Sequence, residues 1–196
     1  MNNNRRKTFM CGRYYIMKQI YQVLKDMGVD VQWNQILLGD CFPKQKIPVI
    51  VENHGKLEIK KMQWGYRIPY TSQLIINARC ETLLEKKLFQ KDVKERRCLI
   101  FAKGFYEWDG HKHQVSFESA HDPILLMAGI YNDKEEVVII TKNANDVMKP
   151  LHSRMPLIID QHDIVQWFDT SISPYQFYDN DYPIQIVSGA YQPSLF

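Results

Sequence analysis

The sequence predicts a single α+β domain built mainly on antiparallel sheet, with a few short helices. Three observations predict this class. Short runs rich in β-forming residues recur along the chain between tight turns, three helical segments interrupt them without alternating with them, and no internal repeat is visible. A chain of 196 residues is long enough to bury a substantial core in one domain.

The first helix is expected over residues 16–27. Apolar residues recur there at helical spacing, and Gly28 follows as a stop signal. Residues 37–48 form a connection that contains Cys41-Phe42-Pro43. Two β-rich runs, residues 47–52 and 57–64, then bracket Asn53-His54-Gly55, which is typical of a hairpin turn.

The middle of the chain begins with an extended run at residues 74–76. A short helix is expected after it, with a buried side formed by Leu83, Leu84, Leu88 and Phe89. Residues 97–108 are rich in β-formers, and Asp109-Gly110 indicates a hairpin to residues 114–117. This part therefore predicts a helix flanked by strands.

The last third predicts two buried strands at residues 124–131 and 137–141, joined by a polar turn. A helix is expected over residues 160–168, with Asp160 as its N-cap. One short apolar run follows at residues 184–187.

The composition argues against a disulfide-bonded secreted protein and against a membrane protein. The net charge of +3 permits nucleic-acid binding without arguing strongly for it. The four cysteines show no CxxC spacing and no secretory signal precedes them, so we expect reduced thiols in a cytoplasmic protein. No run approaches the ~18 apolar residues of a membrane span, so no membrane association is expected.

Met10-Cys11 looks like a start codon and its first retained residue. Arg5-Arg6 can be encoded as AGG AGG, three codons before the Met10 codon, which is how a bacterial ribosome-binding site would look if it were translated. A disordered basic tail is the alternative. The first interpretation predicts a protein of bacterial or phage origin in which residues 1–10 are absent or removed and residues 11–196 form the active domain.

Four local motifs occur in a recognisable order. They are CGRYY at residues 11–15, NARCET at 77–82, GFYEW at 104–108 and LHSRMP at 151–156, accompanied by Trp64-Gly65 and by AGIY at 128–131. Their order and spacing resemble the SRAP family, the SOS-response-associated or abasic-site processing proteins. The similarity runs from Cys11 to about Ser188. Phe101 and Lys103 depart from the family pattern, which more often has a proline and a small or acidic residue there.

The resemblance implies a barrel-like β core and a DNA-repair protein that captures abasic sites in single-stranded DNA through Cys11. The chemistry of an N-terminal cysteine agrees with this role. Its α-amine has a pKa near ~8, so it is partly neutral and can form a Schiff base with the open-chain aldehyde of an abasic sugar. The thiol can then close on the imine carbon to give a thiazolidine ring. We expect a monomer that needs no metal or organic cofactor. The alternative for Cys11 is an ordinary buried thiol.

The resemblance also implies three further catalytic residues. Glu107 lies in a predicted strand among apolar neighbours, which would raise the pKa of its carboxyl and suit proton transfer to the sugar oxygen. His152 can shuttle a proton near neutral pH, and Asn77 can orient the sugar or the amine. From the residues alone, the alternatives are a surface glutamate, a loop histidine that bonds backbone, and a turn-forming asparagine.

DNA contacts are expected from Arg13, Arg79 and Arg154, because guanidinium groups match phosphate oxygens bidentately. Each can instead be a structural ion-pair partner, and for Arg79 the nearby Glu81 makes this alternative about equal. Trp64 and Pro43 are expected to offer apolar faces against which bases stack. A core position is the alternative for Trp64.

His111 and His113 form an HxH pair, but no acidic or cysteine cluster completes a metal site, so we interpret them as exposed turn residues. Cys41, Cys80 and Cys98 are expected to be structural. No metal site is predicted.

Two rival functions remain open. In a cysteine peptidase or amidohydrolase, Cys11 would attack a carbonyl with His152 as its base, and removal of the leader could be autoproteolytic. In a single-stranded DNA-binding module, arginine and tryptophan would act without any covalent step. If the protein captures abasic sites, its Schiff base also allows strand cleavage by β-elimination as a lyase side activity.

Overall fold

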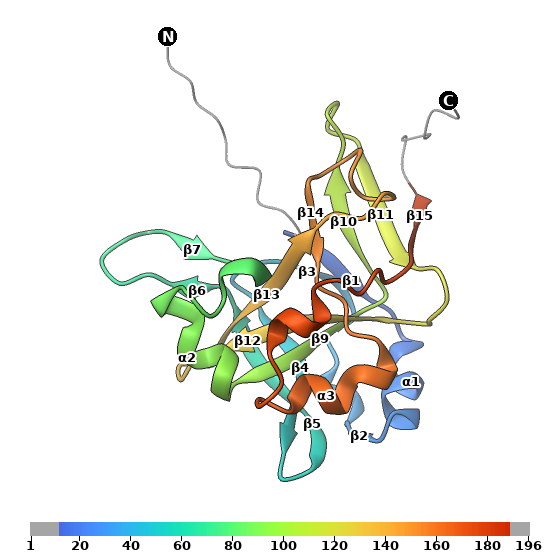
Figure 1. The fold of residues 1–196 in the computed structure, drawn as a ribbon. Coiled ribbons are helices and arrows are strands. Elements are labelled where there is room, and N and C mark those ends of the chain that lie inside the picture. Colours follow the sequence, from blue (N-terminus) through green and yellow to red (C-terminus); the bar gives the residue numbers. More distant parts are fainter. Residues whose placement is uncertain (1–11, 189–196) are drawn as a thin grey trace.

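The structure is a computed structural model that describes residues 12–188. Most of its strands belong to two sheets that meet at the centre of the molecule (Figure 1). The larger sheet runs in the order β14-β13-β12-β9-β4-β5-β2. Its strands are β2 (Val29–Asp30), β4 (Lys46–Asn53), β5 (Lys56–Trp64), β9 (Arg97–Ala102), β12 (Leu125–Tyr131), β13 (Glu136–Asn143) and β14 (Arg154–Pro156).

The larger sheet closes on itself, which confirms the barrel-like prediction. β13 pairs with β12 on one side and with β5 on the other, where Glu136 lies opposite Gln63 and Val137 opposite Trp64. Most neighbouring strands in this ring are antiparallel, and the closing pair is parallel. β8 (Asn77–Arg79) adds to the same strand β13 in parallel.

The smaller sheet has the order β15-β11-β10-β1-β3. Its strands are β1 (Tyr14–Ile16), β3 (Gly39–Cys41), β10 (Gly104–Trp108), β11 (Gln114–Ser119) and β15 (Ile184–Ser188). β10 begins at Gly104, where a Cβ atom would lie 2.4 Å from the Phe117 carbonyl oxygen and 2.6 Å from the Tyr15 hydroxyl. Only glycine therefore allows these strands to approach. A two-stranded arm, β6 (Tyr66–Arg67) and β7 (Leu74–Ile75), projects from the body (Figure 1).

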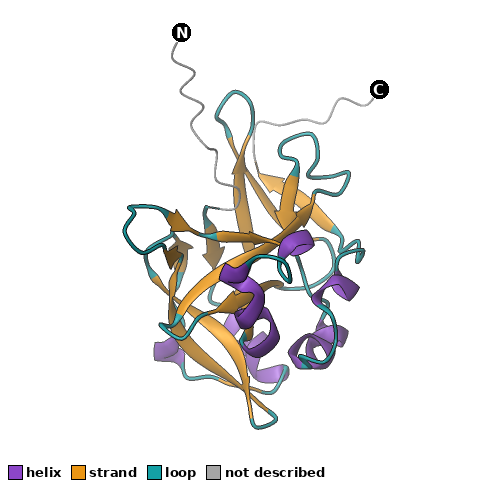
Figure 2. Ribbon diagram, turned by 60° about the vertical axis from the view of Figure 1, so that its left-hand side comes forward, coloured by secondary structure: helices purple, strands orange, loops and turns teal. Residues whose placement is uncertain are grey.

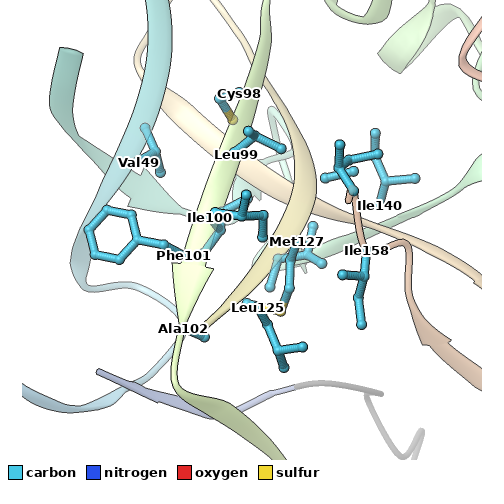
Figure 3. Close-up of a cluster of buried hydrophobic side chains, with 14 of the residues drawn as sticks. Val49, Cys98, Leu99, Ile100, Phe101, Ala102, Leu125, Met127, Ile140 and Ile158 are labelled. Atoms are coloured by element: carbon cyan, nitrogen blue, oxygen red, sulfur yellow. The ribbon is translucent and has the colours of Figure 1, made fainter. Parts of the chain in front are cut away.

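The core lies on both faces of β9, whose six residues are all buried. Phe101 and Val49 lie on one side of this strand, while Met127, Ile140 and Ile158 gather on the other (Figure 3). Because β9 is covered on both faces, its sequence is rich in β-forming residues throughout and does not alternate between apolar and polar residues.

Within the described residues, three α-helices pack around the lower part of the strand framework (Figure 2). They are α1 (Ile20–Asp26), α2 (Lys87–Glu95) and α3 (Ile164–Phe168), and four 3₁₀ turns accompany them: η1 (Trp33–Gln35), η2 (Cys80–Thr82), η3 (Gln161–Asp163) and η4 (Pro174–Phe177). α2 and α3 both contact β9. Between residues 12 and 188, no helix has the length and apolar character needed to span a membrane.

Several local predictions are confirmed. The hairpin between β4 and β5 turns at His54 and Gly55, which both have positive φ. The side chain of Asp160 accepts a hydrogen bond from the amide of His162, as expected of an N-cap. Asp109-Gly110 lies between the paired strands β10 and β11.

Three local predictions are wrong. Residues 39–41, expected to lie in a connection, form β3 because they pair with β1. The expected helix from residue 16 begins only at Ile20, because Tyr14–Ile16 instead forms β1 and pairs with strands on both sides. Leu88 is 40% exposed rather than buried, since the inner face of α2 is formed by Phe89, Asp92 and Val93.

Candidate functional site

The chain that follows Cys11 runs directly beside the GFYEW strand. Cys11 itself lies outside the described residues, and Gly12 is the first residue after it. The amide of Tyr106 donates to the carbonyl of Arg13 at 2.9 Å, as part of the antiparallel pairing of β1 with β10. If the register continued by two residues beyond the end of β1, Gly12 would lie opposite Glu107. Glu107 thus belongs to the strand that neighbours the residue after Cys11.

Glu107 points into the protein and is only 4% exposed. Its neighbours Tyr106 and Trp108 face the opposite side of β10, as alternation along a strand requires. The surface alternative for Glu107 is therefore wrong. Burying a carboxylate is costly, so a glutamate retained here is a candidate for a chemical role.

Arg13 is held by partners on three strands and a turn. Its guanidinium forms an ion pair with Asp40 and donates to the Gln114 side chain at 2.8 Å. Its charge also lies 4.8 Å from the ring centre of Tyr106 and 5.2 Å from that of Phe42. Both terminal nitrogens already have protein partners, so the structural alternative describes Arg13 better than a free phosphate clamp.

Trp64 is fully buried, which corrects the prediction that its indole face stacks on DNA bases. Its ring packs against Tyr14 with centroids 5.3 Å apart, and its Nε1 donates to the carbonyl of Ile76 at 3.2 Å. Because Ile76 precedes Asn77, Trp64 connects the strand after Cys11 to the strand that carries Asn77. Its indole has no exposed face on which a base could stack.

β8 presents Asn77 and Arg79 beside β13, with Asn77 opposite Ile139. Asn77 is half-buried and Arg79 is exposed. Arg79 forms no salt bridge with any residue in the range 12–188. The alternative for Arg79, an ion pair with Glu81, does not occur among these residues because Glu81 binds Arg154. The Arg79 charge is therefore available to an anion.

Arg154 is the partner of Glu81. Its Nη1 and Nη2 both bond the Glu81 carboxylate, the second at 2.8 Å, and further bonds reach Asn143 and the carbonyl of Thr141 at 2.7 Å each. Partial burial tends to raise the pKa of Glu81, but the bonds from Arg154 outweigh it and hold the pKa at about 2. A guanidinium engaged in this way is a structural ion-pair partner rather than the predicted phosphate clamp.

His152 lies two residues before Arg154, and its Nδ1 accepts a hydrogen bond from the Arg154 amide at 3.0 Å. The neutral ring then carries its proton on Nε2. Burial lowers the pKa of His152; a hydrogen bond with the Arg154 backbone opposes this, the positive charge of Arg154 adds to it, and the net shift is downward. At neutral pH the imidazole is uncharged and offers a hydrogen-bond donor at Nε2.

Pro43 lies in the turn between β3 and β4, where it is half-buried beside the exposed ring of Phe42. This turn is anchored to the end of β5, because the Lys44 amide donates to Trp64 and the Trp64 amide donates to Gln45. Pro43 therefore lies next in sequence to the residue whose ring packs on Arg13.

The remaining cysteines are buried thiols. Cys41, Cys80 and Cys98 are free and buried, and burial raises the pKa of Cys41 to about 11 and that of Cys80 to about 12. His113 bonds Asp109 in an exposed turn. Within residues 12–188, no group of three or more possible ligands could hold a metal ion.

Comparison with protein families decides what kind of chain this is. The model of the family described as SOS response associated peptidase (SRAP) matches residues 10–182. The chain belongs to the SRAP family. The match spans nearly all the described residues and includes each of the four motifs.

Curated relatives of this SRAP chain carry the name abasic site processing protein. YoqW of Bacillus subtilis is 27% identical over 180 residues, covering 82% of this chain and 80% of the relative. YedK of Escherichia coli is 26% identical over 181 residues, covering 84% and 82%. These names describe the relatives.

Solved structures show the same fold. A protein from Bacteroides thetaiotaomicron superposes with a TM-score of 0.74 at 20% identity, covering 91% of this chain and 92% of that one. A protein from Bordetella bronchiseptica gives a TM-score of 0.73 at 20% identity, covering 91% and 100%. The α+β, barrel-like prediction is therefore confirmed for this SRAP chain.

Sequence reasoning missed Tyr70 as a candidate DNA contact. Tyr70 lies in the loop between β6 and β7, is fully exposed and has a φ of 63°. The same arm leads through β7 directly into Asn77. An aromatic residue in the polar loop Tyr70-Thr71-Ser72-Gln73 was the available signal, since an exposed ring at a loop tip is typical of a binding residue.

Proposed function

We propose that this SRAP protein captures abasic sites in single-stranded DNA through an N-terminal Cys11, as a monomer that lacks residues 1–10. The observation that carries the proposal is the buried Glu107 on the strand beside the residue that follows Cys11. The names of the relatives support DNA repair at abasic sites as its biological context.

The chemistry balances without a redox partner. The Cys11 amine adds to the aldehyde carbon and loses water to form an imine, and the thiolate then adds to the imine carbon and closes the thiazolidine ring. Glu107 would donate a proton to the departing oxygen. Since the imine acidifies the neighbouring carbon, β-elimination of the strand accompanies capture as a side reaction.

His152 suits this scheme better than it suits the peptidase alternative. With Nδ1 occupied by the Arg154 amide and a proton on Nε2, the neutral imidazole has no free lone pair to activate a thiol. It can instead donate from Nε2 to a sugar oxygen and stabilise negative charge there. Asn77 would orient the sugar from the neighbouring strand.

The DNA path would follow exposed cationic and aromatic side chains. Arg79 supplies a charge that is free to meet a phosphate, and Tyr70, Phe42 and Trp108 offer exposed rings on which unpaired bases stack. Pro43 lies at the edge of this surface. Stacking on single rings favours a splayed single strand over a duplex.

A denaturing gel tests the proposal. Protein that begins at Cys11 is incubated with two matched oligonucleotides, one with an abasic site and one without. We expect a heat-stable and denaturant-stable adduct with the abasic strand only. A complex that is seen on a native gel but is absent from the denaturing gel would instead identify a non-covalent binding module.

Replacing Glu107 by Gln is expected to slow adduct formation by roughly 10²-fold or more, because a positioned general acid contributes about 10²–10⁴-fold. The amide fills the same buried position but cannot transfer a proton. Rates come from quenched gels, and fluorescence anisotropy checks that abasic-strand binding is kept. The exposed Glu85→Gln change is the matched control. Unchanged kinetics in Glu107→Gln would remove this residue from the mechanism.

Replacing Arg79 by Gln is expected to weaken single-strand binding, with or without an abasic site. Losing one phosphate contact should also reduce the magnitude of the slope of log K against log salt by about 0.7. Binding is measured by anisotropy across a salt series, with Lys60→Gln as the control from β5. An identical salt slope in Arg79→Gln and wild type would exclude this contact.

A further inference from the structure

The Glu81–Arg154 pair does more than join two strands. Glu81 follows β8 in the NARCET motif, and Arg154 opens β14, so β13 lies between them. The Glu81 carboxylate accepts both Arg154 bonds and a third from the hydroxyl of Tyr178 at 3.0 Å. Because both carboxylate oxygens are engaged, this glutamate has a fixed position and stays ionised.

Arg154 is fixed in turn at both ends. Its side chain is only 13% exposed and also bonds Thr141 and Asn143 on β13. Its backbone amide is the donor to His152 Nδ1. The guanidinium anchor and the amide that bonds the imidazole therefore belong to one residue.

The charges of Arg154 and Glu81 also act on His152. Arg154 places a positive charge close enough to His152 to disfavour the imidazolium form. Glu81 offsets that charge. Without the carboxylate, an uncompensated guanidinium would repel the imidazolium more strongly and would be held only by its bonds to Asn143 and Thr141.

We propose that Glu81 is a positioning residue that acts through Arg154 to fix the orientation and the Nε2–H tautomer of His152. This inference rests on the proposed role of His152 in abasic-site capture, but its direct readout does not need DNA. It assigns a task to the acidic residue of NARCET, the motif that also contains the proposed site residues Asn77 and Arg79. The arrangement resembles the outer-shell carboxylates that orient histidines in metal sites.

The test compares wild type, Glu81→Gln, Glu81→Asp and the exposed Glu85→Gln by ¹⁵N-detected histidine NMR, with His152→Gln used to assign the signal. We expect wild type and Glu85→Gln to show a neutral His152 protonated on Nε2. Glu81→Gln should show averaged Nδ1 and Nε2 shifts and a lower His152 pKa. Glu81→Asp keeps the charge and should restore part of the wild-type pattern.

Adduct formation provides the second readout. Glu81→Gln is expected to react about 10-fold to 100-fold more slowly, the range found for outer-shell partners of histidines. A His152 spectrum in Glu81→Gln that matches wild type would overturn the inference, whatever the rate. If the spectrum changes while even wild type forms no adduct, the positioning role stands and the proposed function fails. If Glu81→Gln does not fold, the Glu81→Asp spectrum is used instead. A partial change in the His152 signals would support the inference, and signals identical to wild type would overturn it.

Discussion

Cys11→Ala is expected to yield no adduct that survives heat and denaturant. The variant keeps the N-terminal amine and can still form a Schiff base, but it has no thiol to close the ring. An imine hydrolyses readily, whereas ring closure removes the double bond that water attacks. Loss of the stable adduct should therefore be complete on a denaturing gel.

Borohydride separates the two covalent steps. It reduces an imine to a stable amine, so Cys11→Ala should give an adduct only when the reductant is present, and Cys11→Ser should behave similarly. Binding of the abasic strand, measured by anisotropy, serves as the control that the site is intact. A stable adduct in Cys11→Ala without reductant would exclude the thiazolidine and direct attention to another nucleophile.

Arg97→Leu is expected to lower the free energy of unfolding by about 2–6 kcal/mol, because two of the carbonyls that lose their donor are buried and each costs about 1–3 kcal/mol. Arg97 is 5% exposed and donates to four backbone carbonyls, at distances from 2.7 to 3.3 Å. These acceptors are Val93, Trp167, Asp169 and Ile172. The side chain thus fastens α2 and the segment after α3 to β9.

Urea denaturation followed by tryptophan fluorescence measures this effect. Arg97→Lys should recover only part of the loss, since one ammonium group cannot reach four acceptors arranged around a planar guanidinium. The exposed Lys91→Gln is the control and should change the stability by less than about 0.5 kcal/mol. Equal urea midpoints for Arg97→Leu and wild type would show that the segment is held by packing alone.

Much of the fold could be predicted because local signals and tertiary structure agree. The turn at His54-Gly55 and the N-cap at Asp160 depend on residues close in sequence, and both are confirmed. β1 could not be predicted from the apolar spacing of residues 16–27. Its strand conformation is set by pairing with β3 and β10, which are distant in the sequence.

Less of the site than of the fold could be predicted from the sequence. The motifs identified candidate residues, but they did not show which charges were already paired. Arg154 and Glu81 are 73 positions apart and meet only because β8 and β14 flank β13. Trp64 was misassigned because an aromatic residue in a motif can serve the core or the ligand equally well, and only burial distinguishes them.

The measurement that tests the account most directly compares two proteins that differ only at the N-terminus. One begins at Cys11, as verified by intact mass, and the other retains Met10, so that the Cys11 thiol is present but its amine is in a peptide bond. The account predicts a heat-stable adduct with abasic single-stranded DNA for the first protein and none for the second. An equally stable adduct formed at the same rate by the Met10-retaining protein would contradict it.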